Sequence, residues 1–125
     1  MDIVTKKKLN ILIQLAHADR DFASVERDLI FQIARERNYP EAEVEELIQH
    51  PEPIGSLGAL SDRQKADYLM SSVELVMADH RVMESEILFT QNIAIKLGYL
   101  KQVVNHLIDN FDKRQDLRLS DFKQV

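Results

Sequence analysis

The chain contains an internal repeat, in which residues 11–48 align with residues 71–108, without a gap, at a constant offset of sixty positions. Identical pairs include Leu15/Leu75, Ala18/Ala78, Asp19/Asp79, Glu26/Glu86, Ile33/Ile93, Ala34/Ala94, Tyr39/Tyr99, Val44/Val104, Leu47/Leu107 and Ile48/Ile108. Two copies are too few for a solenoid. The repeat therefore predicts one domain, spanning residues 1–125, that is built from two similar units.

Apolar residues recur at helical spacing in both units. In the first unit the stripes are Leu9, Leu12, Ile13 and Ala16, then Leu29, Ile30, Ile33 and Ala34, then Val44, Leu47 and Ile48. In the second they are Ala66, Leu69, Met70, Val73, Val76 and Met77, then a helix from about Glu84 to Gly98, then Leu100, Val103, Val104, Leu107 and Ile108. These stripes predict an all-α fold, a compact bundle of about six to seven helices built from two similar three-helix halves.

Several residues mark the ends of these helices. Pro40 suits the first turn of the third helix. Ser61 and Gln64 have the spacing of a capping box, and Gly98 suits the position just after a helix. The Pro/Gly-containing segment 51–60 is expected to join the halves, with room for one helical turn. After a packed turn around Phe111, we expect a loose tail from about residue 112.

Charge and composition exclude several classes of protein. A net charge of −5 argues against binding nucleic acid. The only basic run, Lys6-Lys7-Lys8, is interpreted as a solvated helix face. Apolar runs are too short for a membrane span, the N-terminus lacks the apolar core of a signal peptide, and there is no Cys for disulfides or thiolate metal sites. These observations indicate a cytoplasmic protein without membrane insertion.

The repeat also duplicates a pair of acids. "LAHADRDFASVE" and "LVMADHRVMESE" each place a Glu seven residues after an Asp. The helical stripes direct Asp19 and Glu26 toward the core edge and toward each other, and Asp79 and Glu86 repeat this. Neighbouring carboxylates at a core edge require backbone amides, an arginine or a metal ion as a counterpart.

Two interpretations of these acids remain open. In the first, Asp19 caps the helix that begins near Ser24 and Glu26 is stabilised in its first turn. The usual cap positions hold Ala23 and Met83, which cap poorly. In the second, the two turns bind a divalent cation such as Ca²⁺ or Mg²⁺. The acids available are Asp19, Asp21 and Glu26 in one turn and Asp79, Glu84 and Glu86 in the other.

The motifs "ADRDFASVERDL" and "ADHRVMESEILF" resemble those of the TerB-like family over roughly residues 9–110. The resemblance implies an all-helical fold of two three-helix halves, a link to tellurite resistance and stress response, and divalent metal binding by the motif acids. Carried to this chain, those ligands are Asp19, Glu26, Asp79 and Glu86. Arg20 and His80 stand where the family usually has Gly, and Arg20, Arg27 and Arg81 are alternative sources of positive charge.

No catalytic constellation stands out, so the chain is not expected to be an enzyme. A Gly-rich phosphate loop and a Ser-His-acid set are missing, and His17, His50, His80 and His106 are interpreted as ordinary surface or boundary residues. No aromatic cluster or large exposed apolar stripe stands out to mark an interface. The expected function is a small protein-interaction module with an unknown protein partner, and self-association is left open. A divalent metal-binding protein is the first alternative, and an enzyme using the paired carboxylates is the weakest.

Overall fold

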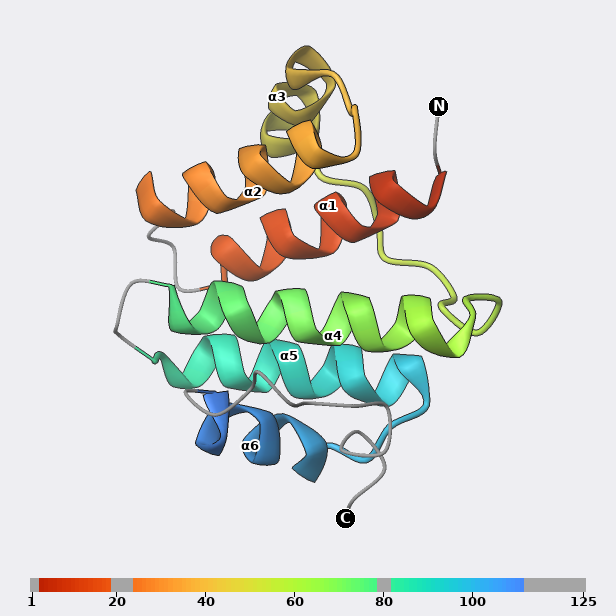
Figure 1. Ribbon diagram of the computed structural model, residues 1–125, viewed down its shortest axis with the longest axis vertical. Coiled ribbons are helices and arrows are strands. Elements are labelled where there is room, and N and C mark those ends of the chain that lie inside the picture. Colours follow the sequence, from red (N-terminus) through yellow and green to blue (C-terminus); the bar gives the residue numbers. More distant parts are fainter. Residues whose placement is uncertain (1–2, 19–23, 79–81, 112–125) are drawn as a thin grey trace.

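The computed structural model describes residues 3–18, 24–78 and 82–111 (Figure 1). Its helices are α1 (Ile3–Ala16), α2 (Ser24–Glu36), α3 (Glu41–Gln49), α4 (Asp62–Met77), α5 (Glu84–Leu97) and α6 (Gln102–Asp109). The described ranges hold these six helices and no strand. The predicted all-helical bundle is therefore confirmed. None of the helices in these ranges is both long enough and apolar enough to cross a bilayer.

The two halves meet along the central helices. α1 and α4 lie side by side through the middle of the molecule, with α2 and α3 packed on α1, and α5 and α6 packed on α4 (Figure 1). α2 contacts α3, as α5 contacts α6, so the pairing within the first half recurs in the second. α1 also reaches α5 across the boundary between halves.

The repeat extends to the hydrogen bonds that end α2 and α5. Asn38 and Gly98 occupy equivalent positions and both have positive φ, 57° and 94°. The next residues, Tyr39 and Tyr99, each donate a backbone hydrogen bond of 2.9 Å to the carbonyl five residues earlier. This is the Schellman arrangement. Gly98 is predicted for it, and Asn38 is one of the few other residue types that tolerate a left-handed backbone.

The other predicted boundaries agree with the structure in part. The capping box of α4 is present: Ser61 Oγ accepts from the Gln64 amide at 3.1 Å, and Gln64 Oε1 accepts from the Ser61 amide at 2.8 Å. Pro40 is the N-cap of α3, one position before the first turn where it was placed. No helical turn forms in segment 51–60.

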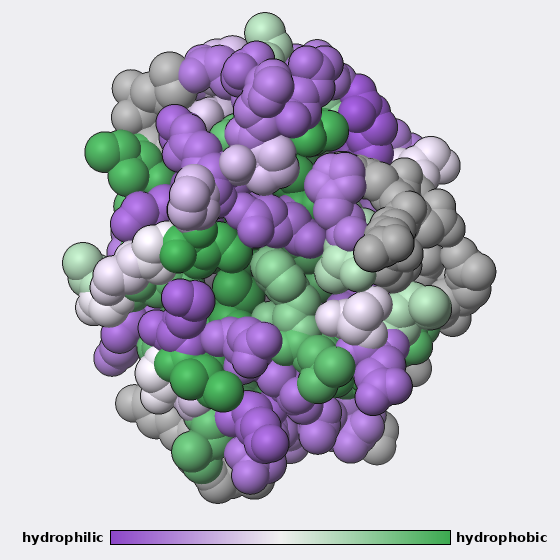
Figure 2. Space-filling view, turned by 180° about the vertical axis from the view of Figure 1, so that it is seen from behind, coloured by the Kyte–Doolittle hydropathy of each residue, from purple (hydrophilic) through white to green (hydrophobic). Residues whose placement is uncertain are grey.

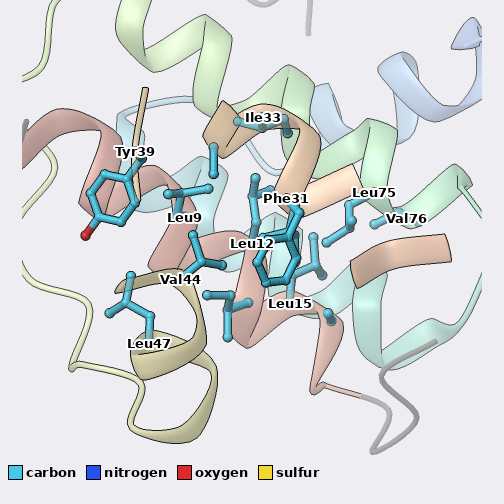
Figure 3. Packing of buried hydrophobic residues seen from close by; sticks show 14 residues of the cluster. Leu9, Leu12, Leu15, Phe31, Ile33, Tyr39, Val44, Leu47, Leu75 and Val76 are labelled. Carbon is cyan, nitrogen blue, oxygen red and sulfur yellow. The ribbon is translucent and has the colours of Figure 1, made fainter. Parts of the chain in front are cut away.

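The core forms two clusters, each of which includes residues from both halves. Figure 3 shows the first of them. In the first cluster, Leu75 and Val76 of α4 pack among residues of α1, α2 and α3. The second cluster, on the α4 side, includes Ile11 of α1. Phe89 of α5 contacts both clusters. The two three-helix halves are therefore joined by interleaved apolar side chains.

The interpretation of the Lys6-Lys7-Lys8 run as a solvated face is wrong for Lys8. Lys8 is only 4% exposed, because it lies on the side of α1 that faces α4, and its Nζ is 2.8 Å from Asp67 Oδ2. Burial lowers the pKa of Lys8, against the opposing effect of Asp67. Lys6 stays at the surface and pairs with Glu52 at 2.8 Å. The pairing of buried Lys8 with the partly exposed Asp67 thus ties the two halves together.

Leu100 also departs from its predicted place. It was included in the apolar stripe of the last helix, but α6 begins at Gln102, and Leu100 precedes the helix and is exposed. Phe111 is partly buried against the second core cluster. The tail predicted from about residue 112 lies outside the described residues.

Candidate functional site

The structure describes two of the four predicted metal ligands. Glu26 and Glu86 belong to α2 and α5, whereas Asp19 and Asp79 lie outside the described residues. The same is true of Arg20, Asp21, His80 and Arg81. Within the ranges that the structure covers, no group of three or more His, Asp or Glu side chains is placed to hold a metal ion.

Glu26 and Glu86 occupy matching places in the two halves. Each is the third residue of its helix, and each is only 1% exposed. The N-terminal ends of α2 and α5 lie at the same end of the molecule as the C-terminal ends of α1 and α4 (Figure 1). The sequence predicted that both acids point inward, and their burial is consistent with that.

The helix ends stabilise these carboxylates. The first turn of a helix carries free amides and the positive end of its dipole, which favour a carboxylate by about 0.3–1 kcal/mol. At the start of α5, the N-cap residue Met83 supplies no side-chain hydrogen bond. The acid at the third position is therefore well placed to interact favourably with this helix end. Both side chains have interactions in the structure.

Arg27, one of the alternative sources of positive charge, directs its guanidinium toward α3. Its guanidinium pairs with Glu45 of α3 and lies over the ring of Phe31, 4.7 Å from the ring centroid. Arg27 therefore links α2 to α3 at the surface. The physical reason is helical spacing, because Arg27 follows the inward-pointing Glu26 by one residue and projects from another side of the helix.

A second feature, absent from the sequence prediction, is the outer face of α5. Leu88 and Ile95 are 53% and 55% exposed. They lie seven residues apart and so share one side of the helix, opposite the buried Glu86, Ile93 and Leu97. The apolar pattern of the sequence shows no large exposed stripe and does not single out these two residues.

The repeat provides an internal comparison for this face. The positions equivalent to Leu88 and Ile95 are Asp28 and Arg35 in α2, and both are exposed. The three-helix unit therefore forms with charged residues at these two positions. The sequence contained this signal, because aligning the two repeats pairs a charged residue with an apolar one at both sites.

The remaining surface includes a hollow beside α1. It has a volume of about 210 Å³, and Ile3, Asn10, Ile54 and Leu57 are among its lining residues. The side-chain amide of Asn10 makes two hydrogen bonds to the backbone of Glu52. Asn10 Nδ2 donates to the Glu52 carbonyl at 2.8 Å, and Asn10 Oδ1 accepts from the Glu52 N–H at 2.9 Å. These bonds fasten segment 51–57 to α1, which favours a structural role. Seen from behind, hydrophilic residues surround several apolar patches (Figure 2).

Comparisons of this chain with known protein families, with curated proteins and with solved structures found no match. The likeness to the TerB-like family therefore rests on the two acidic motifs. The function has to be argued from the two features described above, the acidic helix starts and the apolar face of α5.

Proposed function

We propose that this chain is a helical protein-interaction module whose binding surface is the outer face of α5. The observation that carries the proposal is the exposure of Leu88 and Ile95 at positions where the repeat has Asp28 and Arg35. Burying a Leu or Ile side chain is favourable by about 1.5–3 kcal/mol relative to leaving it in water. A partner that covers both residues would gain this free energy.

α5 is suited to present these side chains without rearranging. Its opposite side is fixed in the core through Ile93, Ala94 and Leu97. A preorganised surface loses little conformational entropy on binding. Exposed Glu84 and Lys96 stand near the two ends of the helix. The partner we infer is a protein surface with apolar side chains in the centre and charges at the edges.

The TerB-like resemblance supports a broader setting for this module. On that basis we infer a cytoplasmic protein that takes part in a stress response such as tellurite resistance. Protein binding rather than catalysis is the activity inferred, because an exposed apolar face on a helix is one of the differences between the two halves.

Residue-specific photo-crosslinking in the native host tests the interaction face. A photoreactive amino acid at position 88 should form protein adducts, because the partner covers this side of α5. The same amino acid at position 28 should form far fewer, because that position lies on the charged face of α2. Equal yields at positions 88 and 28, or no adduct at position 88, would contradict the proposal.

Divalent cation binding at the acidic end is a second candidate function. The observation that favours it is the equal burial of Glu26 and Glu86 at equivalent positions of two helices that start at the same end of the molecule. Carboxylate oxygens are the ligands that Ca²⁺ and Mg²⁺ prefer. Asp19 and Asp79, the other predicted ligands, precede these helices in the sequence.

Thermal unfolding with and without millimolar Ca²⁺ or Mg²⁺, at constant ionic strength, tests this candidate. A native-state cation site predicts a saturable rise in Tm of several degrees, because binding stabilises the folded chain by mass action. Glu86→Gln should abolish the rise. Glu46→Gln, which removes an exposed charge of α3 that belongs to neither acidic turn, should preserve it. If the acids only stabilise helix ends, neither ion changes the Tm of the wild-type chain.

A further inference from the structure

Five exposed apolar residues lie on or beside α5, and four of them form two pairs that share one midpoint. The fifth, Val82, has Lys101 at its mirror position. Leu88 and Ile95 lie equally far, on opposite sides, from the midpoint between Gln91 and Asn92. Met83, the N-cap of α5, and Leu100, just beyond its end, are also exposed and are also equidistant from that midpoint. An isologous contact requires this kind of pattern, because each position i of one copy meets position j of the other, and j meets i.

We propose that the partner on this face is a second copy of the chain, with the two α5 helices packed antiparallel about a twofold axis at Gln91 and Asn92. This inference rests on the proposed function and names its partner. In the pair, Leu88 of each copy packs against Ile95 of the other, and Met83 approaches Leu100. All four apolar residues on each copy are then covered by apolar residues of its mate.

The charges at the ends of α5 agree with an antiparallel pair. Glu84 is exposed in the first turn and Lys96 is exposed in the last. Antiparallel packing places Glu84 of one copy within one turn of Lys96 of the other, twice per dimer. It also brings together helix ends of opposite dipole sign. A parallel pair would set Glu84 beside Glu84 and Lys96 beside Lys96.

The centre of the contact is polar and suits the symmetry axis. Asn92 is exposed, and Gln91 is only partly covered, with its Nε2 3.4 Å from Asn105 Oδ1 of α6. Side-chain amides both donate and accept, so residues of the same type can pair across a twofold axis. These amides would fix the register in which Leu88 meets Ile95.

The size of the contact indicates a weak dimer. A helix of 14 residues is about 21 Å long. The surface that one helix and its flanks can cover is at the low end for specific complexes, below about 1,200 Å² in total. The dimer is therefore expected to form in the micromolar range or above, and to be in exchange with the monomer.

Sedimentation velocity over a concentration series up to millimolar tests the dimer. The wild-type chain should shift from monomer to dimer. The double variant Leu88→Asp with Ile95→Arg, which copies the residues of α2, should stay monomeric with an unchanged circular dichroism spectrum. Asp28→Ala with Arg35→Ala, the matched change on α2, should dimerise like the wild type.

A charge exchange makes the test specific to an antiparallel second copy. In a dimer of the Glu84→Lys variant, the introduced lysine of each copy lies near Lys96 of the other. In a dimer of the Lys96→Glu variant, the introduced glutamate lies near Glu84 of the other copy. Each variant alone should therefore associate more weakly than the wild type. Mixed together, the two variants form a heterodimer in which a lysine of one chain faces a glutamate of the other at both ends. A parallel wild-type pair already sets like charges beside each other, so in that register neither variant alone would lose a favourable pair. Weaker association of each variant alone therefore identifies the antiparallel register. The mixture should form heterodimers at concentrations where each variant alone is monomeric.

The results separate this inference from the proposed function. A wild-type chain that stays monomeric at millimolar concentration, or a dimer that survives Leu88→Asp with Ile95→Arg, overturns the second-copy inference. If such a monomer still crosslinks from position 88 to another protein, the interaction face stands and only the identity of the partner is wrong. If position 88 gives no adduct and the chain is monomeric, both fail.

Discussion

Asp67→Ala should destabilise the chain by about 1–3 kcal/mol, whereas Lys8→Met should change its stability by less than about 1 kcal/mol. The ammonium of Lys8 is almost completely buried and lies 2.8 Å from Asp67. Removing the carboxylate leaves this buried charge without its counterpart. The free energy of unfolding from denaturant titrations, with an unchanged m value, measures the effect.

Lys8→Met is the informative control, because it removes the buried charge and fills the space with an unbranched apolar side chain of similar length. Asp67 keeps its second partner, Arg37, whose Nη2 lies 2.9 Å from the same carboxylate oxygen. Asp67→Asn retains an acceptor for the Lys8 ammonium. Its loss of stability should therefore lie between those of Asp67→Ala and Lys8→Met. Equal losses in Asp67→Ala and Lys8→Met would mean that the attraction within the pair, and not the isolated buried charge, sets the stability.

The loss of stability caused by Asp67→Ala, relative to the wild type, should be smaller in alkaline solution. Burial lowers the pKa of Lys8 below its usual 10.5, and the loss of Asp67 leaves burial and the neighbouring Arg37 to lower that pKa further. Between the lowered pKa and 10.5, the unfolded chain binds more protons than the native chain, so native stability rises with pH. Burial raises the pKa of Tyr39 and of Tyr99, which acts in the opposite direction. Both chains share these tyrosines, so the difference between variant and wild type at about pH 7 and about pH 9.5 isolates Lys8.

Local signals in the sequence predicted the helices well. The capping box at Ser61 and Gln64 and the helix stop at Gly98 each depend on residues within one turn of each other, so their spacing is sufficient to find them. The apolar stripes predicted the all-helical class, because helical periodicity is a property of a single segment. The start of α6 was misplaced, since Leu100 has the spacing of the stripe but precedes the helix.

Contacts between the halves could not be predicted in the same way. Lys8 meets Asp67 across 59 residues of sequence, and nothing near Lys8 indicates that its neighbour on α4 is an acid. Arg27 was considered as one source of positive charge for the acidic turn because it is near in sequence, and its pairing with Glu45 on the adjacent helix was not anticipated. Such pairings depend on how helices pack, which periodicity within one helix does not specify.

The two candidate surfaces differ in how readily they could be predicted from the sequence. Glu26 and Glu86 were identified because the repeat duplicates them, and their equal burial is consistent with an inward direction. Leu88 and Ile95 carried the opposite signal, a difference between the repeats where most positions agree in character. A comparison that searches only for identical pairs overlooks it. Finding these two residues therefore requires a comparison of the positions at which the repeats differ as well as those at which they match.

Ile93→Ala should destabilise the chain by about 2–5 kcal/mol, because it removes a buried side chain from the second core cluster and leaves a cavity. Ile33→Ala, at the equivalent position in the first cluster, should have an effect in the same range. Total stabilities of domains are about 5–15 kcal/mol, so both variants should remain folded but melt at clearly lower denaturant concentration.

Ile95→Ala provides the matched control, since it makes the same chemical change two residues further along the same helix. Ile95 is exposed, so its truncation should change stability by no more than about 0.5 kcal/mol in dilute solution, and the higher helix propensity of Ala opposes even that loss. At the concentrations where the wild-type chain dimerises, Ile95→Ala should weaken association instead. A loss under about 1 kcal/mol for Ile93→Ala, or equal losses for Ile93→Ala and Ile95→Ala in the monomer, would show that the buried and exposed sides of α5 are assigned wrongly. In that case the core would have to pack through Ile95, and the surface proposed for the second copy would not exist.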